Sequence, residues 1–155
     1  MQLNGWRKVQ CGVGMIEVLI ALVIISVSML GLAALQINSV RFNHQAYLRS
    51  QATYLAYDIL DRMRANETQA ESGAYSITLN DDSSGSTACD TGTCSTTALV
   101  NYDKAQWLAM LKEELPEGDG VVSMSGSKVT VSVQWDQSQG QDSETIQTYT
   151  LEALL

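Results

Sequence analysis

The chain of 155 residues contains a single histidine, His44, and a single proline, Pro116. Without a serine, histidine and aspartate set, a glycine-rich phosphate loop or clustered metal ligands, little is available for catalysis. Basic residues are also scarce, because 9 lysines and arginines oppose 17 aspartates and glutamates and the formal net charge is -8. This acidity argues against a phosphate-binding surface. We therefore predict neither an enzyme nor direct binding to nucleic acid, and no cofactor or metal.

Residues 18–40 carry no charge at all. At about 1.5 Å per residue, a helix over residues 18–35 is roughly 27 Å long, which spans the core of a bilayer. Arg7 and Lys8 precede this run, and short basic flanks stay in the cytoplasm. We therefore expect a single pass through the inner membrane, with the residues after Leu35 facing the periplasm or the exterior.

Only three cysteines occur, Cys11, Cys89 and Cys94. Cys89 and Cys94 would lie in an oxidising compartment and are near enough in sequence to close a small loop, so we predict a disulfide between them. A zinc site needs more ligands than two thiols, and His44 is far away in sequence. Cys11 is left over, in the short segment before the apolar run.

The six residues Gly12-Val13-Gly14-Met15-Ile16-Glu17 open the apolar run directly. An ordinary secretory signal has its cleavage site after its apolar stretch, whereas this pattern comes before it. It resembles the class III leader of type IV prepilins and type II secretion pseudopilins, although Val13 and Gly14 stand where phenylalanine and threonine are usual. The resemblance implies a leader of residues 1–12, cleavage by prepilin peptidase between Gly12 and Val13, and N-methylation of Val13.

Glu17 is a lone carboxylate at the edge of the apolar run. Its burial in hydrocarbon costs roughly 2.5 to 3.5 kcal/mol, so a cationic partner is expected. Cleavage after Gly12 would create an α-amine at Val13, and pairing between subunits would satisfy both charges and set the register of neighbouring helices. Three alternatives remain: Glu17 only favours a helix start, the run is a plain anchor, or a secretory signal is cleaved near residues 32–34.

The helical pattern continues beyond the apolar run. A stripe of apolar residues recurs at steps of three and four, which predicts one helix over residues 14–65 whose second half is amphipathic and docks on a globular head. The members of the stripe are Leu48, Ala52, Leu55, Ile59 and Met63. Asp58 and Arg62 are expected to form an exposed pair on the other side.

The rest of the chain predicts a small α+β head. A short strand over 75–79 is followed by a loop over 80–97 and by a helix that Asn101 caps and Pro116 ends. Strand-like segments over 121–124, 128–135 and 145–151 form an antiparallel meander. Its apolar face is expected to pack on the amphipathic half of the long helix.

Three further features carry a more specific resemblance: the sequence LGLAALQ over residues 30–36, the sequence DRMRAN over residues 61–66, and the paired cysteines ahead of Tyr102-Asp103 and Trp107-Leu108. With them the chain resembles the type IV pilus modification proteins, minor pilins of the PilV kind. The resemblance implies a ladle-shaped fold, with residues 13–40 in the membrane or filament core and residues 41–155 as a periplasmic head.

By the same resemblance, the protein primes pilus assembly or forms the pilus tip, and supports twitching motility, adhesion or DNA uptake. The implied partners are prepilin peptidase, other minor pilins, the major pilin, the inner-membrane assembly platform and membrane lipid. One alternative is a minor pseudopilin of a type II secretion system. Another, of a different class, is a bitopic periplasmic binding module.

Overall fold

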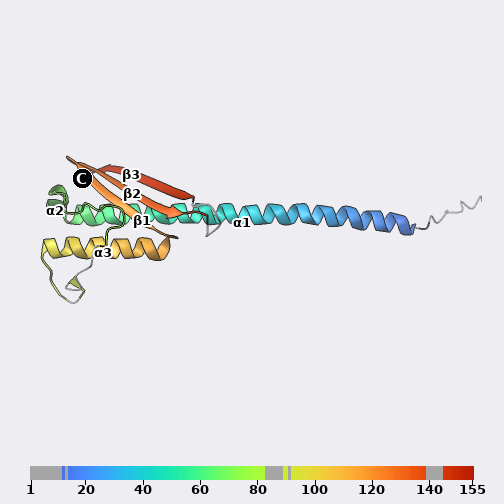
Figure 1. Cartoon of the computed structure of the whole chain (residues 1–155), viewed down its shortest axis with the longest axis horizontal. Coiled ribbons are helices and arrows are strands. Elements are labelled where there is room, and N and C mark those ends of the chain that lie inside the picture. Colours follow the sequence, from blue (N-terminus) through green and yellow to red (C-terminus); the bar gives the residue numbers. More distant parts are fainter. Residues whose placement is uncertain (1–11, 13, 83–88, 91, 139–144) are drawn as a thin grey trace, which may run out of the picture. The chain divides into compact units, whose positions relative to one another are not determined.

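The computed structural model describes residues 12, 14–82, 89–90, 92–138 and 145–155 (Figure 1). The predictions for Arg7, Lys8, Cys11 and Val13, and for the leader apart from Gly12, fall outside these residues. The chain divides into two compact units, residues 1–43 and 44–155. We call the second one the head unit and describe the two units separately.

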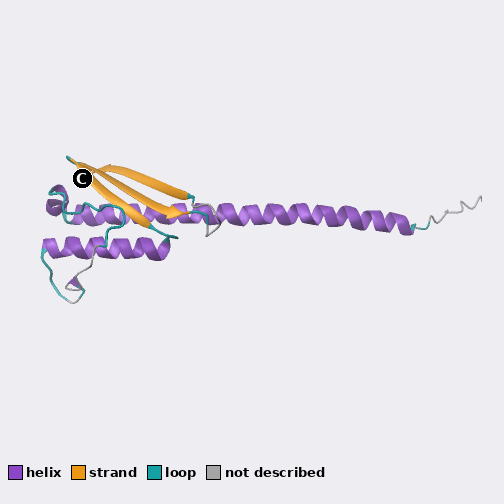
Figure 2. Cartoon of the chain, viewed as in Figure 1, coloured by secondary structure: helices purple, strands orange, loops and turns teal. Residues whose placement is uncertain are grey.

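Helix α1 (Met15–Ala65) begins one residue after the predicted start and ends where predicted (Figure 2). In the first unit its apolar side chains are exposed. The hydroxyls of Ser26 and Ser28 donate to the carbonyl oxygens of Leu22 and Ile24, at 2.7 Å and 2.8 Å. These polar groups are thus satisfied within the helix, as a hydrocarbon environment requires. By length and composition, α1 is able to cross a membrane.

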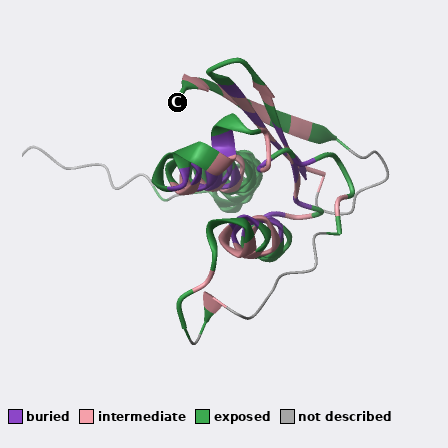
Figure 3. Cartoon of the chain, turned by 90° about the vertical axis from the view of Figure 1, so that its left-hand side faces the viewer, coloured by how far each residue is buried: buried purple, intermediate pink, exposed green. Residues whose placement is uncertain are grey.

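The part of α1 in the head unit buries the predicted apolar stripe. Leu48, Ala52, Leu55, Ile59 and Met63 are all buried. Ala56 and Leu60 are buried beside them, which widens the stripe. Figure 3 shows the buried parts of the helices and the sheet turned toward one another. The periodicity of the sequence therefore identified the core side of the helix correctly.

Three strands form an antiparallel sheet in the order β1-β2-β3. They are β1 (Asp119–Ser125), β2 (Lys128–Asp136) and β3 (Ile146–Leu154). The predicted meander is confirmed. On β2 the alternate side chains of Val129, Val131, Val133 and Trp135 are buried. The strand expected over 75–79 is reduced to a single bridge between Ile77 and Val122.

Among the described residues of the head unit, two helices occur besides α1, whereas one was predicted. The short α2 (Glu67–Glu71) follows α1, and Gly73, with φ of 79°, turns the chain after it. Helix α3 (Thr96–Glu114) begins earlier than predicted, because its N-cap is Ser95, whose hydroxyl accepts the N–H of Ala98 at 3.2 Å. Asn101 lies inside α3 and is not its cap.

Trp107 joins α3 to its neighbours at the centre of the head unit. Its side chain is fully buried, and its indole Nε1 donates to the carbonyl oxygen of Leu55 on α1 at 2.8 Å. On the sheet side, Gly120 of β1 lies so close that a Cβ there would stand 2.4 Å from Cη2 of Trp107. Only glycine permits this approach, so the side chain of Trp107 connects α3 to both α1 and β1.

Candidate assembly site and polar network

Glu17 lies in the first turn of α1, where its backbone N–H donates to the carbonyl oxygen of Gly14 at 3.0 Å. A carboxylate at this end of a helix is favoured by the helix dipole. Its neighbours Met15 and Ile16 are 87% and 73% exposed. Among the described residues no cation forms an ion pair with Glu17. The carboxylate is thus open to a partner from another chain.

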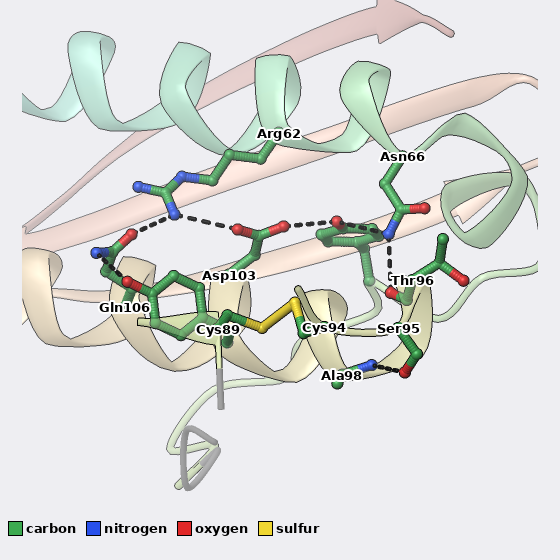
Figure 4. Close-up of a disulfide and its surroundings, with 11 residues drawn as sticks. Arg62, Asn66, Cys89, Cys94, Ser95, Thr96, Ala98, Asp103 and Gln106 are labelled. Atoms are coloured by element: carbon green, nitrogen blue, oxygen red, sulfur yellow. Dashed lines mark hydrogen bonds and ion pairs between the residues drawn. A yellow bond between two sulfur atoms is a disulfide. The ribbon is translucent and has the colours of Figure 1, made fainter. Parts of the chain in front are cut away.

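The predicted disulfide is present between Cys89 and Cys94, whose Cα atoms are 5.2 Å apart (Figure 4). The bond ends immediately before Ser95, the N-cap of α3, so it anchors the chain at the start of that helix. Asp90 accepts a hydrogen bond from the hydroxyl of Tyr102 on α3, and this bond raises the pKa of Tyr102. The small loop is therefore held to α3 at two points.

A buried carboxylate, Asp103 of α3, is the centre of a polar network in the head unit. One oxygen accepts from Nη1 of Arg62 at 3.2 Å, and the other accepts from the hydroxyl of Tyr75 at 2.7 Å. Only 6% of Asp103 is exposed. A buried charge of this kind needs a cation and further donors, and Arg62 and Tyr75 supply them.

From Asp103 the network extends in two directions, through Tyr75 to Asn66 and through Arg62 to Gln106. The side-chain amide of Asn66 donates to the hydroxyl of Tyr75 at 3.3 Å and to the carbonyl oxygen of Thr96 at 3.0 Å. Arg62 donates to Gln106, whose amide in turn donates to Tyr102 at 3.3 Å. As Figure 4 shows, these bonds join the end of α1 to the part of α3 from Thr96 to Gln106.

The ion pair between Asp58 and Arg62 exists at 2.8 Å, but its predicted setting is wrong. Both side chains are more than three-quarters covered, with 23% and 22% exposed. Arg62 also reaches Asp103 and Gln106 on α3. The pair therefore belongs to the contact between two helices and is not a solvated surface pair.

No member of the network was predicted as a site residue, and this includes its centre, Asp103, and Tyr75. A signal for Asp103 exists in the sequence, since Val100, Asp103, Trp107 and Leu111 follow one another at steps of three and four. A charged residue on such a stripe is expected to have a buried partner. The identity of the partner could not be found this way, because Arg62 is 41 residues away.

The geometry supports a structural role for the network. Each polar side chain in it has a partner, and none is a nucleophile beside a general base. In the part of the chain that the structure describes, no group of three or more histidine, cysteine, aspartate or glutamate residues could hold a metal ion. What the network can do is fix the end of α1 against α3.

Tyr75 makes the stability of the head unit dependent on alkaline pH. Burial, and next its hydrogen bond to Asp103, raise the pKa of Tyr75 above its ordinary value. Neutral Tyr75 therefore stabilises the fold fully below about pH 10, and this contribution is lost as pH rises toward the higher folded pKa. We expect urea midpoints, followed by circular dichroism, to fall above about pH 10.

Tyr75→Phe should remove the part of the fall in urea midpoint at alkaline pH that Tyr75 causes, since the variant has no phenol to ionise. Tyr54→Phe is the matched control, because Tyr54 is 65% exposed on α1. An equal alkaline loss in wild type and Tyr75→Phe would contradict the role assigned to the buried phenol.

Two family models match the chain, in adjoining segments. The prokaryotic N-terminal methylation motif matches residues 7–33, which include Gly12, Val13 and Glu17. The family described as type IV pilin Tt1218 matches residues 34–105, which include Arg62, the disulfide and Asp103. No curated protein and no solved structure matches the chain.

Proposed function

Because the chain is a type IV pilin-like protein, we propose that it is a minor pilin that takes part in priming pilus assembly or in forming the pilus tip. The observation that carries the proposal is Glu17, an exposed carboxylate with no ion-pair partner among the described residues, at the start of an exposed apolar helix. The methylation motif implies processing by a prepilin peptidase and assembly with other pilins.

Processing supplies the missing partner of Glu17. Prepilin peptidase cleaves between Gly12 and Val13, and Val13 becomes the N-methylated terminus. Its α-amine then pairs with Glu17 of a neighbouring subunit, since in a helix bundle either charge left alone costs more than the two charges paired. The pair sets the axial register of the two helices and draws the subunit from the inner membrane into the filament.

The head unit serves recognition between subunits rather than catalysis. Its buried polar groups are used to fix α1 on α3, which supports a structural protein with no substrate of its own. The apolar part of α1 and the methylation motif fit membrane anchoring and incorporation into a pilus. We place the head unit in the periplasm, where it contacts other minor pilins, the major pilin and the assembly platform, in support of motility, adhesion or DNA uptake.

Coexpression with prepilin peptidase, followed by mass spectrometry of the intact protein, tests the processing step. The expected product begins at N-methylated Val13. Gly12→Leu should abolish cleavage, because the class III leader that the first residues resemble has glycine before the cut, whereas Gly5→Leu is a matched control in the same leader and should be processed normally. A product that still begins at Met1 with active peptidase present would reject the proposal.

A minor pseudopilin of a type II secretion system is the second candidate, because the class III leader that the first residues resemble is common to both systems. Deletion of the gene separates the two. Loss of surface pili supports the minor pilin, whereas loss of protein secretion with intact pili supports the pseudopilin. A bitopic binding module would show neither phenotype and no processing.

A further inference from the structure

Two exposed arginines of α1, Arg41 and Arg49, follow the charge-free run and have no ion-pair partner among the described residues. The other described lysines and arginines all reach an oxygen of the chain. Arg62, Arg64, Lys112 and Lys128 form ion pairs with carboxylates, and Lys104 donates to the carbonyl oxygen of Ser76 at 2.8 Å. Arg41 and Arg49 are thus cations that the described part of the chain does not neutralise.

The sequence around the two arginines contains no acidic residue. No aspartate or glutamate occurs over residues 18–57, and Asp58, the first carboxylate after Glu17, is paired with Arg62 at 2.8 Å. The formal net charge of the whole chain is -8, so an anionic surface repels most of it. The local positive charge at Arg41 and Arg49 therefore favours an anionic partner at this part of α1.

The position of the arginines on α1 indicates which anionic partner fits. Arg41 comes immediately after residues 18–40, which are long enough to cross the core of a bilayer. Beside the arginines, Phe42 and Tyr47 are 68% and 58% exposed. Aromatic side chains next to cations at the end of a span are typical of the layer of lipid headgroups. A carboxylate on another protein would explain the arginines but not the two aromatic side chains.

The direction of the helix also favours a lipid contact. Side chains of an α-helix are tilted toward its N-terminus, which on α1 is the end that carries the apolar run. Long arginine side chains can therefore reach back toward the membrane. Arg41 starts at the edge of the hydrocarbon core, whereas Arg49 follows the run by nine residues, about 13 Å at the helical rise. A headgroup layer is about 5 to 7 Å thick, so Arg41 makes the closer contact.

We propose that Arg41 and Arg49 bind phosphate groups of anionic phospholipids in the periplasmic leaflet, with Phe42 and Tyr47 among the headgroups. A guanidinium donates two parallel hydrogen bonds to one phosphate, which suits it to this contact. Each arginine binds a headgroup of its own, so no contact between the two units of the chain is required. The lipid contact fixes how far α1 enters the bilayer. It rests on the membrane insertion in the proposed function, and not on cleavage after Gly12.

Native mass spectrometry of the full-length protein, released from detergent micelles that hold equal amounts of phosphatidylglycerol and phosphatidylcholine, tests the contact. Every sample carries Arg7→Gln and Lys8→Gln, so that the cations before the apolar run do not bind the anionic lipid. This background protein is expected to retain phosphatidylglycerol over phosphatidylcholine. Arg41→Gln should lower the retention of phosphatidylglycerol about fivefold, the factor that one cation contributes near an anionic membrane surface. Arg49→Gln should lower it by less, because the attraction falls off within a Debye length.

Arg64→Gln is the matched control, because Arg64 is an exposed arginine of the same helix that already pairs with Asp61 at 3.1 Å. Its lipid retention should equal that of the background protein. The proposal is overturned if Arg41→Gln with Arg49→Gln retains phosphatidylglycerol fully, which would assign the arginines to carboxylates of another subunit. It is also overturned if Arg64→Gln loses as much, or if both lipids are retained equally. Peptidase cleavage, measured separately, tests the proposed function whatever the lipid result.

Discussion

Asp103→Ala is expected to lower the free energy of unfolding of the head unit by about 3 kcal/mol. Removal of the carboxylate leaves the largely covered guanidinium of Arg62 without its main partner on α3, and the hydroxyl of Tyr75 without its acceptor. Breaking a fully buried pair costs about 3 to 5 kcal/mol. We expect the lower end of this range, because Arg62 still forms its ion pair with Asp58 and its side chain is 22% exposed to solvent.

Denaturant unfolding of the full-length protein in detergent, followed by tryptophan fluorescence, measures this loss, since Trp107 and Trp135 are buried. Asp103→Asn should fall between wild type and Asp103→Ala, because it keeps the shape and one acceptor but removes the charge. Asp61→Ala is the matched control, as Asp61 is 70% exposed in its pair with Arg64, and its cost should be below about 1 kcal/mol. Equal midpoints for Asp103→Ala and Asp61→Ala would contradict the central position of Asp103.

Glu17→Ala is expected to leave membrane insertion intact and to reduce incorporation into pili by at least about tenfold. On the proposed pairing, removal of the carboxylate leaves the terminal amine of the neighbouring subunit unpaired in hydrocarbon, and an ionised group there costs roughly 2.5 to 3.5 kcal/mol. Each 1.4 kcal/mol is about a factor of ten in an equilibrium constant, so the expected loss is large. Immunoblots of sheared pili and of membranes, taken from the same cells, measure the amount of the protein in pili relative to the amount in membranes.

Ser26→Ala is the matched control for Glu17→Ala. It removes a polar group from the same helix, but one that is already satisfied by the carbonyl oxygen of Leu22 and offers nothing to a neighbour. Its incorporation should equal that of wild type. If Glu17→Ala enters pili as well as Ser26→Ala does, Glu17 has no role in register, and the helix-start interpretation is sufficient.

Elements with a strong apolar period were predictable from the sequence. The stripe from Leu48 to Met63 and the alternation of Val129, Val131 and Val133 each identify a buried face, because one side of a helix or strand has to leave water. Helix ends were less predictable. Ser95 and Asn101 are both good caps in principle, and the start of α3 depends on the packing of Val100 and on where the disulfide holds the chain.

The contacts of Arg62 could not be predicted from its neighbours in sequence. Four residues from Asp58, it fits an exposed helical pair, and nothing local indicates that α3 covers it. The covering residue is Asp103, which is brought there by the fold. The same is true of Gly120, whose missing side chain has a reason only once Trp107 lies against it.

By itself the sequence determined the membrane-spanning length of the apolar run, the carboxylate at its edge, the N-terminal methylation motif and the buried faces of the main elements. These depend on local order along the chain, namely charge, period and spacing. Only the tertiary structure decided that Arg62, Asp103, Tyr75 and Asn66 share one network, and that the two arginines after the apolar run have no ion-pair partner among the described residues. The network and the unpaired arginines depend on which segments, far apart in the sequence, pack against each other and exclude water. No pattern among neighbouring residues indicates the hydrogen bonds between such segments.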